Sequence, residues 1–397
     1  MKVVNHRAAP DDLPALAAAD GRAFGFHHTS QDLDDFRRLY EPERFLLARD
    51  PADGGIVGVT GSFTFDVTMP GGRPLATQGV TWVSVAVTHR RQGVLRGLLE
   101  QQHREFAEEG LALSVLTASE GGIYGRFGYG QAGRERTMRI DRRLARMRPD
   151  ARVAGDVRQV DTERVRALAP DVHRRWAALT PGAVSRNDNW WDVLLLDREH
   201  DRDGGTPLFH LLHPDGYASY RIHHDDRLCQ VVDFFAVTDE AHAALWRTLL
   251  SLDLIHTITS SSCPVDDPLP FLLQDPRRVE TSGIADGLWA RILDVEAVLG
   301  ARPYAVELDV VLDVADPFLG LGGRFRLCGG PDGASCVRVD SAADAHLDIA
   351  TLGALAFGTH RATTLARAGL VTAEAPVLRR VDAAFTADRE VRHGTHF

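Results

Sequence analysis

The chain has 397 residues, of which 44% are hydrophobic and 25% charged, as is typical of a soluble globular protein with two or three domains. Its formal net charge of −10 argues against a nucleic-acid-binding scaffold. The N-terminal segment has no secretory h-region, and no apolar run is long enough for a membrane span. We therefore expect a cytoplasmic protein that binds no nucleic acid and does not span a membrane.

Residues 1–132 are predicted to form the first domain, because strand and helix patterns alternate along them. After a first strand, the expected helices cover 11–19 and 30–39, and the expected strands cover 45–49, 55–66 and 78–87. The acidic residues of the second helix are expected to form a solvated face rather than a catalytic carboxylate pair: Asp32, Asp34 and Asp35.

A strand and a basic turn meet near the end of this series. Val83–Val87 is β-branched with small residues between, which suits a strand buried on both faces. A helix is predicted to start near Gly93, because the next apolar residues are spaced i, i+3 and i+4: Leu95, Leu98 and Leu99. Three arginines flank the glycine: Arg90, Arg91 and Arg96. A helix N-terminus with added positive charge would bind a phosphate, although a solvated basic turn explains the same residues.

The next segment adds a second strand and a glycine-rich loop. Leu113–Thr117 is apolar, which predicts a strand–helix–strand unit with a right-handed crossover. Residues 118–130 then place Tyr124 and Tyr129 among closely spaced glycines, a composition that excludes regular secondary structure. A rigid loop with buried aromatic rings explains the rings, but not a phenol at the end of the strand. A ligand with a pyrophosphate at one end and a thioester at the other fits both halves, and acetyl-CoA is such a ligand.

Residues 133–290 are predicted to form a second domain that repeats the order of strands followed by a helix. The expected strands cover 206–213, 216–223 and 229–237, and the expected helix covers 239–253. The turn Thr238–Glu240 is acidic and would repel a pyrophosphate, so this domain is expected to bind no acetyl-CoA. His223–Asp226 resembles a metal cluster, but adjacent residues in a hairpin turn point in different directions, so we expect no metal.

Residues 291–397 are predicted to form a third domain. The expected strands cover 304–314, 323–327 and 334–339, and the expected helices cover 351–358 and 373–386. The cysteines of the chain show no CxxC spacing: Cys229, Cys263, Cys328 and Cys336. Cys328 and Cys336 flank a turn and would be able to face each other across a hairpin, although we favour reduced, buried thiols.

Several motifs together resemble a known family. Arg90–Leu95 matches the Arg/Gln-x-x-Gly-x-Gly/Ala signature of the GNAT N-acetyltransferase superfamily, except that its last residue is leucine, which is similar to the form in Eis proteins. The run ASEGGIYGRFGYG at 118–130 is similar to the hallmark of the Eis ("enhanced intracellular survival") acetyltransferases of actinobacteria. The resemblance continues at 216–221, at 286–295 and at a chain end in Phe397, so it extends over essentially the whole chain.

The resemblance implies an α/β (α+β) fold with tandem GNAT-like mixed-sheet domains and a C-terminal sterol-carrier-protein-like α+β domain. It implies that 1–132 is the catalytic domain that binds acetyl-CoA and that 133–290 is a degenerate copy without a cofactor site. It further implies that 291–397 delivers the C-terminus to the active site, and that the protein is a homo-oligomer, namely a homohexamer.

The resemblance also assigns residues to the chemistry. Acetyl transfer needs a free-base amine, a polarised thioester carbonyl and a proton for the departing thiolate. Tyr124 matches the proton donor of the family, while Tyr129 is the competing candidate and is expected to pack under the loop. The C-terminal carboxylate of Phe397 matches the base of the family. Taken alone, the last five residues, HGTHF, would be expected to form a frayed chain end.

The remaining site residues are assigned as two groups. The expected cofactor contacts are Val83, Ser84, Val85, Arg91, Gln92, Gly93, Val94, Leu95, Arg96, Ser119 and Glu120. The expected wall of the acceptor pocket is Phe24, Phe26, His27, Phe36 and Trp82.

The resulting hypothesis is an N-acetyltransferase that moves an acetyl group from acetyl-CoA, without a metal, to small-molecule primary amines of aminoglycoside, polyamine or lysine type. Eis relatives place an acidic residue near positions 24–26, whereas this chain has Phe24-Gly25-Phe26, which argues against a preference for multiply charged aminoglycosides. The alternative hypothesis is a non-catalytic lipid-binding or interaction protein with a vestigial GNAT half.

Overall fold

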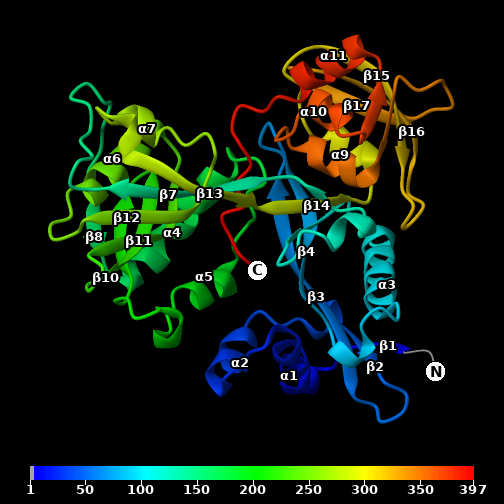
Figure 1. The fold of residues 1–397 in the computed structure, drawn as a ribbon, viewed down its shortest axis with the longest axis horizontal. Coiled ribbons are helices and arrows are strands. Elements are labelled where there is room, and N and C mark those ends of the chain that lie inside the picture. Colours follow the sequence, from blue (N-terminus) through cyan, green and yellow to red (C-terminus); the bar gives the residue numbers. More distant parts are fainter. Residues whose placement is uncertain (1–3) are drawn as a thin grey trace. The chain divides into compact units, whose positions relative to one another are not determined.

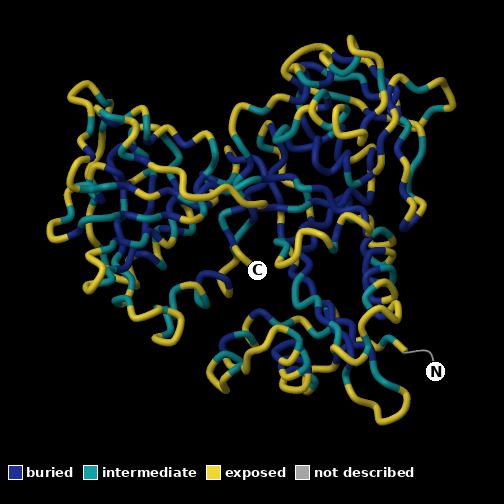
Figure 2. The backbone as a smooth tube through the Cα atoms, in the orientation of Figure 1, coloured by how far each residue is buried: buried dark blue, intermediate teal, exposed yellow. Residues whose placement is uncertain are grey.

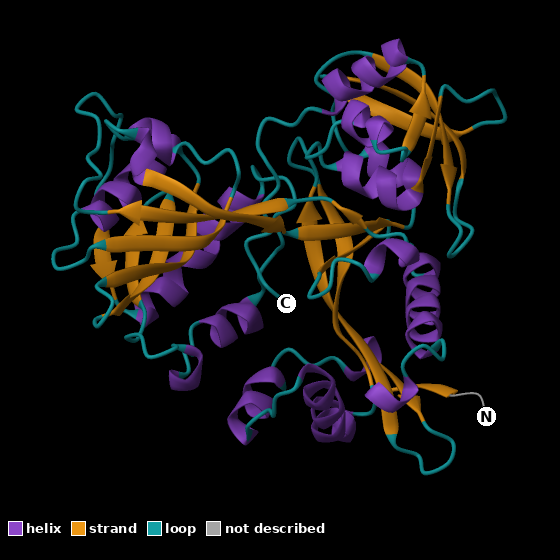
Figure 3. Ribbon diagram, in the orientation of Figure 1, coloured by secondary structure: helices purple, strands orange, loops and turns teal. Residues whose placement is uncertain are grey.

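The computed structural model describes residues 4–397, so the first three residues of the predicted first domain lie outside it (Figure 1). The chain divides into two compact units. The first comprises the described residues up to Ala132, together with Leu288–Asp388 and His396–Phe397. The second comprises Gly133–Gly287 and Arg389–Thr395. Each unit combines helices with β-sheet (Figure 3).

The first unit contains a seven-stranded sheet with the order β1-β2-β3-β4-β5-β14-β6. Its strands are β1 (Val4–Arg7), β2 (Leu46–Arg49), β3 (Ile56–Thr68), β4 (Pro74–Val85), β5 (Leu113–Thr117), β14 (Leu288–Ile292) and β6 (Gly130–Gln131). Strands β4 and β5 pair in parallel, and the other neighbours pair antiparallel. The sheet is therefore mixed, as the sequence predicts.

Helices cover both faces of this sheet. They are α1 (Leu13–Phe24), α2 (Ser30–Phe36) and α3 (Val94–Glu108), and short 3-10 helices lie at Pro10–Asp12, Pro42–Arg44, Val87–His89 and Tyr124–Phe127. Successive side chains of a strand point to opposite faces. Accordingly, Leu47 packs with Leu16 of α1, whereas Leu46 packs with Leu98 of α3.

One expected strand of the first domain needs correction. The predicted strand 78–87 ends at Val85, because Val87–His89 forms a 3-10 turn and the side chain of Val87 is 68% exposed. The boundary expected at residue 290 stays a prediction; residue 290 lies inside strand β14, which pairs with β5 in the first sheet. The change of unit falls between Gly287 and Leu288.

The second unit contains its own seven-stranded sheet with the order β13-β7-β12-β11-β10-β9-β8. Its strands are β7 (Arg134–Asp141), β8 (Arg158–Val160), β9 (Phe209–His213), β10 (Gly216–His223), β11 (Leu228–Ala236), β12 (Thr257–Cys263) and β13 (Val279–Asp286). Its helices are α4 (Thr162–Ala177), α5 (Asp188–Leu194), α6 (Asp239–Leu250) and α7 (Leu269–Leu272), with 3-10 helices at Glu199–Asp201 and Pro276–Arg278. Strand β13 forms an edge whose residues after Val279 are exposed (Figure 2).

The two sheets repeat one arrangement. In the first, a parallel pair is joined through α3, and its pairing ends at Gly79 opposite Val115 although β4 continues to Val85. In the second, the parallel pair of β11 and β12 is joined through α6, and its pairing ends at Val231 opposite Ser260 although both strands continue. Each parallel pair therefore separates beyond its paired residues, which opens space between the strand ends.

The third segment of the chain forms a five-stranded sheet with the order β17-β16-β15-β18-β19. Its strands are β15 (Leu308–Ala315), β16 (Gly323–Gly330), β17 (Gly333–Arg338), β18 (Ala345–Asp348) and β19 (Val371–Ala373), and its helices are α8 (Val295–Gly300), α9 (Ile349–Ala356), α10 (Ala362–Arg367) and α11 (Ala375–Phe385). A Cβ atom added at Gly130 of β6 would lie 1.8 Å from the carbonyl oxygen of Ala350, so glycine is required where α9 meets the first sheet. The fully buried ion pair of Arg291 and Asp316, at 2.7 Å, joins the same two parts.

All cysteines in the described part of the chain are free. Cys336 stands opposite Leu327 and Cys328 stands opposite Ser335, so the two cysteines lie on opposite faces of the hairpin. The possibility that they face each other is therefore wrong. Cys328 is also only partly buried, in contrast to the other three. Among residues 4–397, no helix combines the length and apolar character needed to cross a membrane.

Candidate active site

A cavity of about 710 Å³ lies among the end of β4, the start of α3 and the loop after β5. All the predicted cofactor residues except Gln92 line it. The side chain of Gln92 instead donates a hydrogen bond to the carbonyl of Thr88 at 3.0 Å, so it braces the turn rather than facing the cavity. The sequence thus located the cavity, and local hydrogen bonding accounts for the exception.

The start of α3 is arranged to receive an anion. The backbone N–H of Gly97 donates to the carbonyl of Gly93 at 2.9 Å, so the N–H groups of Val94–Arg96 precede the first intrahelical hydrogen bond. Gly93 has φ 83° and Arg91 has φ 62°, both in the left-handed region. Backbone N–H groups in such a turn form a concave anion-binding surface. The side chains of Arg90, Arg91 and Arg96 are exposed and therefore accessible to a phosphate.

A β-bulge shapes the other wall of the cavity, and the sequence analysis missed it. Val59 pairs with Ser84 and Gly61 pairs with Thr81, so the pair of residues between them on β4 stands opposite a single residue of β3. The first of this pair, Trp82, has φ 50°. A bulge bends its strand and leaves the extra residue unpaired. No glycine or asparagine marks this position, so the sequence carries no local signal for it.

The two tyrosines of the glycine-rich loop have different surroundings. Tyr124 begins the 3-10 helix after β5, and burial raises the pKa of its phenol to about 12. The hydroxyl of Tyr129 lies 2.7 Å from Nε2 of His103 and 2.8 Å from Oγ of Ser114. Burial lowers the pKa of His103 to about 3, so the ring is neutral, and its Nδ1 donates to the carbonyl of Leu99 at 2.6 Å. Nε2 therefore accepts the proton of Tyr129, which leaves Tyr124 as the phenol that faces the cavity.

A second cavity, of about 330 Å³, adjoins the first. Both are lined by Tyr124 and Phe24. The second is also lined by Phe397, whose ring centroid lies 5.1 Å from that of Phe65. A Cβ atom added at Gly79 would lie 2.7 Å from Cε2 of Phe397, so the glycine makes room for the terminal ring. In the structure the last residue is packed rather than frayed.

Only part of the expected acceptor wall lines this second cavity. Phe24 and Trp82 do so, whereas Phe36 lies behind Trp82 and stacks on it with ring centroids 4.2 Å apart. Phe26 and His27 line neither cavity, and both are exposed. His28, which the sequence analysis missed, also stacks on Trp82 with centroids 5.3 Å apart. Burial lowers the pKa of His28, so its ring is neutral at pH 7.

A buried carboxylate next to strand β4 was also missed. Asp20 of α1 is 5% exposed and accepts a hydrogen bond from the side chain of Ser84. Burial raises the pKa of Asp20 to about 6, and the hydrogen bond opposes that shift. The position follows a run of alanines in the sequence, which gives no sign of its contact with β4.

The corresponding cleft of the second unit, about 230 Å³, differs in charge. Thr238 caps α6 by accepting the N–H of Ala241, and Asp239 occupies the first turn of the helix. The lining further includes the acidic side chains Asp266, Asp267 and Glu390, together with Arg389 and Arg392. The helix start is thus acidic here, whereas arginines flank the start of α3.

That His223–Asp226 binds no metal stays a prediction. Nε2 of His223 lies 3.1 Å from Oε1 of Gln230, which is on the neighbouring strand.

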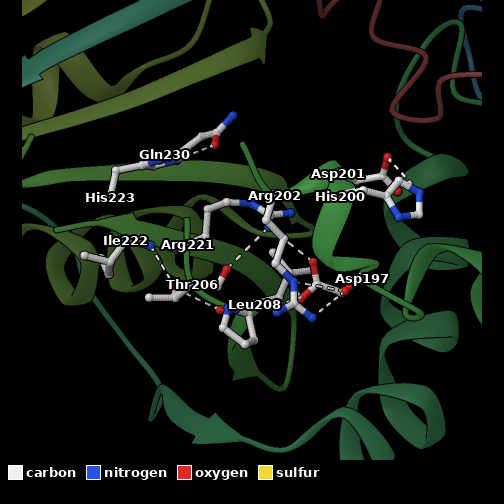
Figure 4. A network of polar contacts seen from close by, with 11 residues as sticks. Asp197, His200, Asp201, Arg202, Thr206, Leu208, Arg221, Ile222, His223 and Gln230 are labelled. Carbon is white, nitrogen blue, oxygen red and sulfur yellow. Dashed lines mark hydrogen bonds and ion pairs between the residues drawn. The ribbon is translucent and has the colours of Figure 1, made fainter. Parts of the chain in front are cut away.

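Nearby, the carboxylate of Asp197 forms ion pairs with Arg221 at 3.2 Å and Arg202 at 3.4 Å (Figure 4). This polar network ties the loop before β9 to strand β10.

Comparison with known proteins identifies the class. Residues 5–132 and residues 182–292 each match an acetyltransferase (GNAT) domain, and residues 295–392 match a sterol carrier protein domain. The fold and the cavity at α3 are thus those of a GNAT acetyltransferase with a duplicated catalytic fold and a third, sterol-carrier-like domain.

Full-length relatives then identify the family. The chain is 40% identical to N-acetyltransferase Eis of Mycobacterium tuberculosis over 398 residues, which cover 98% of each chain. It is 36% identical to an uncharacterized N-acetyltransferase of Streptomyces coelicolor, with 94% of this chain and 92% of the relative covered. The crystal structure of Eis1 from Mycobacterium abscessus superposes with a TM-score of 0.88 at 33% identity and covers both chains completely. The chain belongs to the Eis family of N-acetyltransferases.

Proposed function

We propose that this acetyltransferase moves the acetyl group of acetyl-CoA directly to a primary amine, with Tyr124 as acid and the carboxylate of Phe397 as base. The observation that carries the proposal is the meeting of two cavities at Tyr124: one extends to the start of α3, and the other is lined by Phe397. A cofactor in the first and an amine in the second would bring the thioester and the nucleophile together beside the phenol.

The first cavity suits acetyl-CoA along its length. The N–H groups of Val94–Arg96 and the side chains of Arg91 and Arg96 would hold the pyrophosphate. The backbone of Val83–Val85 would pair with the amide groups of the pantetheine arm in the manner of a strand, and Ser119-Glu120 would close over it. The separation of β4 from β5 beyond Gly79 supports this placement, because it leaves room for the arm beside β4.

Acetyl transfer in this site uses one base and one acid. The amine loses its proton to the carboxylate of Phe397 and attacks the thioester carbonyl, so that a C–N bond forms and the C–S bond breaks. Tyr124 supplies a proton to the departing thiolate, and exchange with solvent then reprotonates the phenolate and removes the proton from the Phe397 carboxyl group. With a pKa of about 12 the phenol is protonated throughout the neutral range. A terminal carboxylate has an ordinary pKa of about 3.3–3.7, so apolar neighbours such as Phe65 would be needed to make it a better base.

Other parts of the chain have supporting roles in this proposal. The second domain binds no acetyl-CoA, because acidic side chains line the cleft that corresponds to the cofactor cavity. The third domain serves an architectural role, which its tight packing of α9 against β6 supports. Assembly into a cytoplasmic homohexamer stays a prediction from the family resemblance. The vestigial-GNAT alternative gains no support from the described site, in which the helix start and Tyr124 are both intact.

The test is the release of thiol from acetyl-CoA in the presence of an amine panel containing an aminoglycoside, a polyamine and an arylalkylamine. We expect release that depends on the amine, accompanied by an N-acetylated product. Absence of release with every amine, together with a lipid that co-purifies with the protein, would instead favour the lipid-binding alternative.

A further inference from the structure

The composition of the acceptor cavity indicates which amines it accepts. It is lined by aromatic, aliphatic and hydroxyl side chains, and no aspartate or glutamate is among them in the part of the chain that the structure describes. We propose that the acceptor is a monoamine with an aromatic or similarly flat apolar body, rather than a polycation. This inference rests on the proposed function, since it names the substrate class of the same site.

Charge is the first argument. Each ammonium group that enters an apolar cavity loses hydration and must regain it from an anionic partner. Under the proposed function the carboxylate of Phe397 pairs with one ammonium, whose charge is then lost on acetylation. A polyamine or an aminoglycoside would bring further ammonium groups that find no carboxylate among the lining side chains.

The carboxylates of Asp20 in α1 and of Asp32 and Asp35 in α2 have other roles. Asp32 accepts the backbone N–H of Thr29 at 2.7 Å in the capping box of α2. Asp35 of the same helix is 9% exposed. Asp20 of α1 accepts a hydrogen bond from Ser84, which lines the first cavity and not the acceptor cavity. These groups are committed to the fold or buried, so they do not present an anionic wall to the acceptor.

The aromatic rings are the second argument. The indole of Trp82 is held in place by stacking with Phe36 and His28, with centroids 4.2 and 5.3 Å away. Phe24 remains 49% exposed although it lines both cavities, and Phe26, with its ring centroid 6.4 Å from that of Phe24, is 44% exposed. Rigid aromatic surfaces bind flat apolar groups well, and they also attract a single cation over the ring face.

Size is the third argument. The acceptor cavity measures about 330 Å³, at the small end of the range for small-molecule sites. A single ring with a short aminoalkyl chain suits this volume, and its amine would reach toward Tyr124 while the ring contacts Trp82. A three-ring aminoglycoside would have to leave most of its body outside the cavity.

The experiment compares kcat/KM for 2-phenylethylamine, spermidine and kanamycin with purified full-length protein. We expect 2-phenylethylamine to be preferred over each polycation by at least about tenfold. The variant Phe24→Asp adds a carboxylate to the shared wall and is expected to move the ratio toward spermidine by at least about tenfold. The matched control is Phe271→Asp, because Phe271 is 75% exposed and lies in the second unit, so the ratio is expected to stay unchanged.

The outcomes separate this inference from the proposed function. A wild-type ratio of one or less overturns the substrate class but leaves the amine acetyltransferase intact. No turnover of any amine overturns the proposed function itself. Because the wild-type ratio alone decides the question, a Phe24→Asp variant that fails to fold does not remove the test.

Discussion

Replacing Gly79 by alanine is expected to displace the last residue of the chain and lower turnover. The added Cβ would lie 2.7 Å from Cε2 of Phe397 and 2.6 Å from Cε2 of Phe65, both well inside contact distance. Phe65 is 3% exposed within the sheet, whereas Phe397 is only half-buried at the chain end, so the terminal ring is expected to move. Overpacking of this kind costs about 1–3 kcal/mol. If that cost falls on the docking of Phe397, the ratio of docked to undocked chain ends decreases roughly 5- to 150-fold.

The assay is kcat for an amine at saturating acetyl-CoA, with the affinity for acetyl-CoA measured by calorimetry. We expect kcat to fall by up to that factor while the affinity stays within about twofold, and deletion of Phe397 or its extension by one glycine to lower kcat further. Gly283→Ala is the matched control, because a Cβ at this strand glycine meets no atom within 4 Å. Unchanged kcat in both Gly79→Ala and the Phe397 deletion would refute the role of the terminal carboxylate.

Two further variants test stability. Burial raises the pKa of Asp20 from 3.8 to about 6, so its contribution to folding is fully present below about pH 3.8 and is lost as the pH rises through 6. Asp20→Asn is therefore expected to stabilise the protein at pH 7.5 by up to about 3 kcal/mol and to have little effect at pH 4, as measured by chemical denaturation. Arg291→Ala leaves the carboxylate of Asp316 buried and unpaired, which is expected to cost about 3–5 kcal/mol, whereas replacing both with apolar residues is expected to cost less. A loss below 1 kcal/mol for Arg291→Ala would contradict this reading of the ion pair.

The cavity at the start of α3 was largely predictable because its parts are adjacent in the sequence. The spacing of Leu95, Leu98 and Leu99 predicts α3, and Gly93 marks its start, as the structure shows. Strand β5 covers the predicted Leu113–Thr117. Local periodicity suffices here, since the helix start and the strand ends that line the cavity follow directly from it.

The long-range parts of the fold were not predictable in the same way. A Cβ at Gly128 would lie 1.5 Å from Nη1 of Arg291, so this glycine of the family hallmark is required by packing against a distant strand. Gly130 is likewise required by the approach of α9. Nothing in the local pattern says which remote segment covers a glycine, and for the same reason the insertion of β14 beside β5 could not be foreseen.

The acceptor site shows the same limit at single residues. Trp82 lines the second cavity, as the sequence suggested, but its bulge depends on the register between β3 and β4. His27 was chosen where its neighbour His28 makes the contact with Trp82. Which of two adjacent side chains points inward is set by the path of the chain after α1, which composition does not reveal.

The central claim, that Tyr124 protonates the departing thiolate, is tested most directly by Tyr124→Phe. We expect kcat to fall by about 100-fold or more while the affinity for acetyl-CoA stays within about twofold, because only the proton of the phenol is removed. Tyr129→Phe is the control, since its hydroxyl is committed to His103, and its kcat is expected to stay within a few-fold of the wild type. An unchanged kcat in Tyr124→Phe, or a larger loss in Tyr129→Phe, would contradict the assignment.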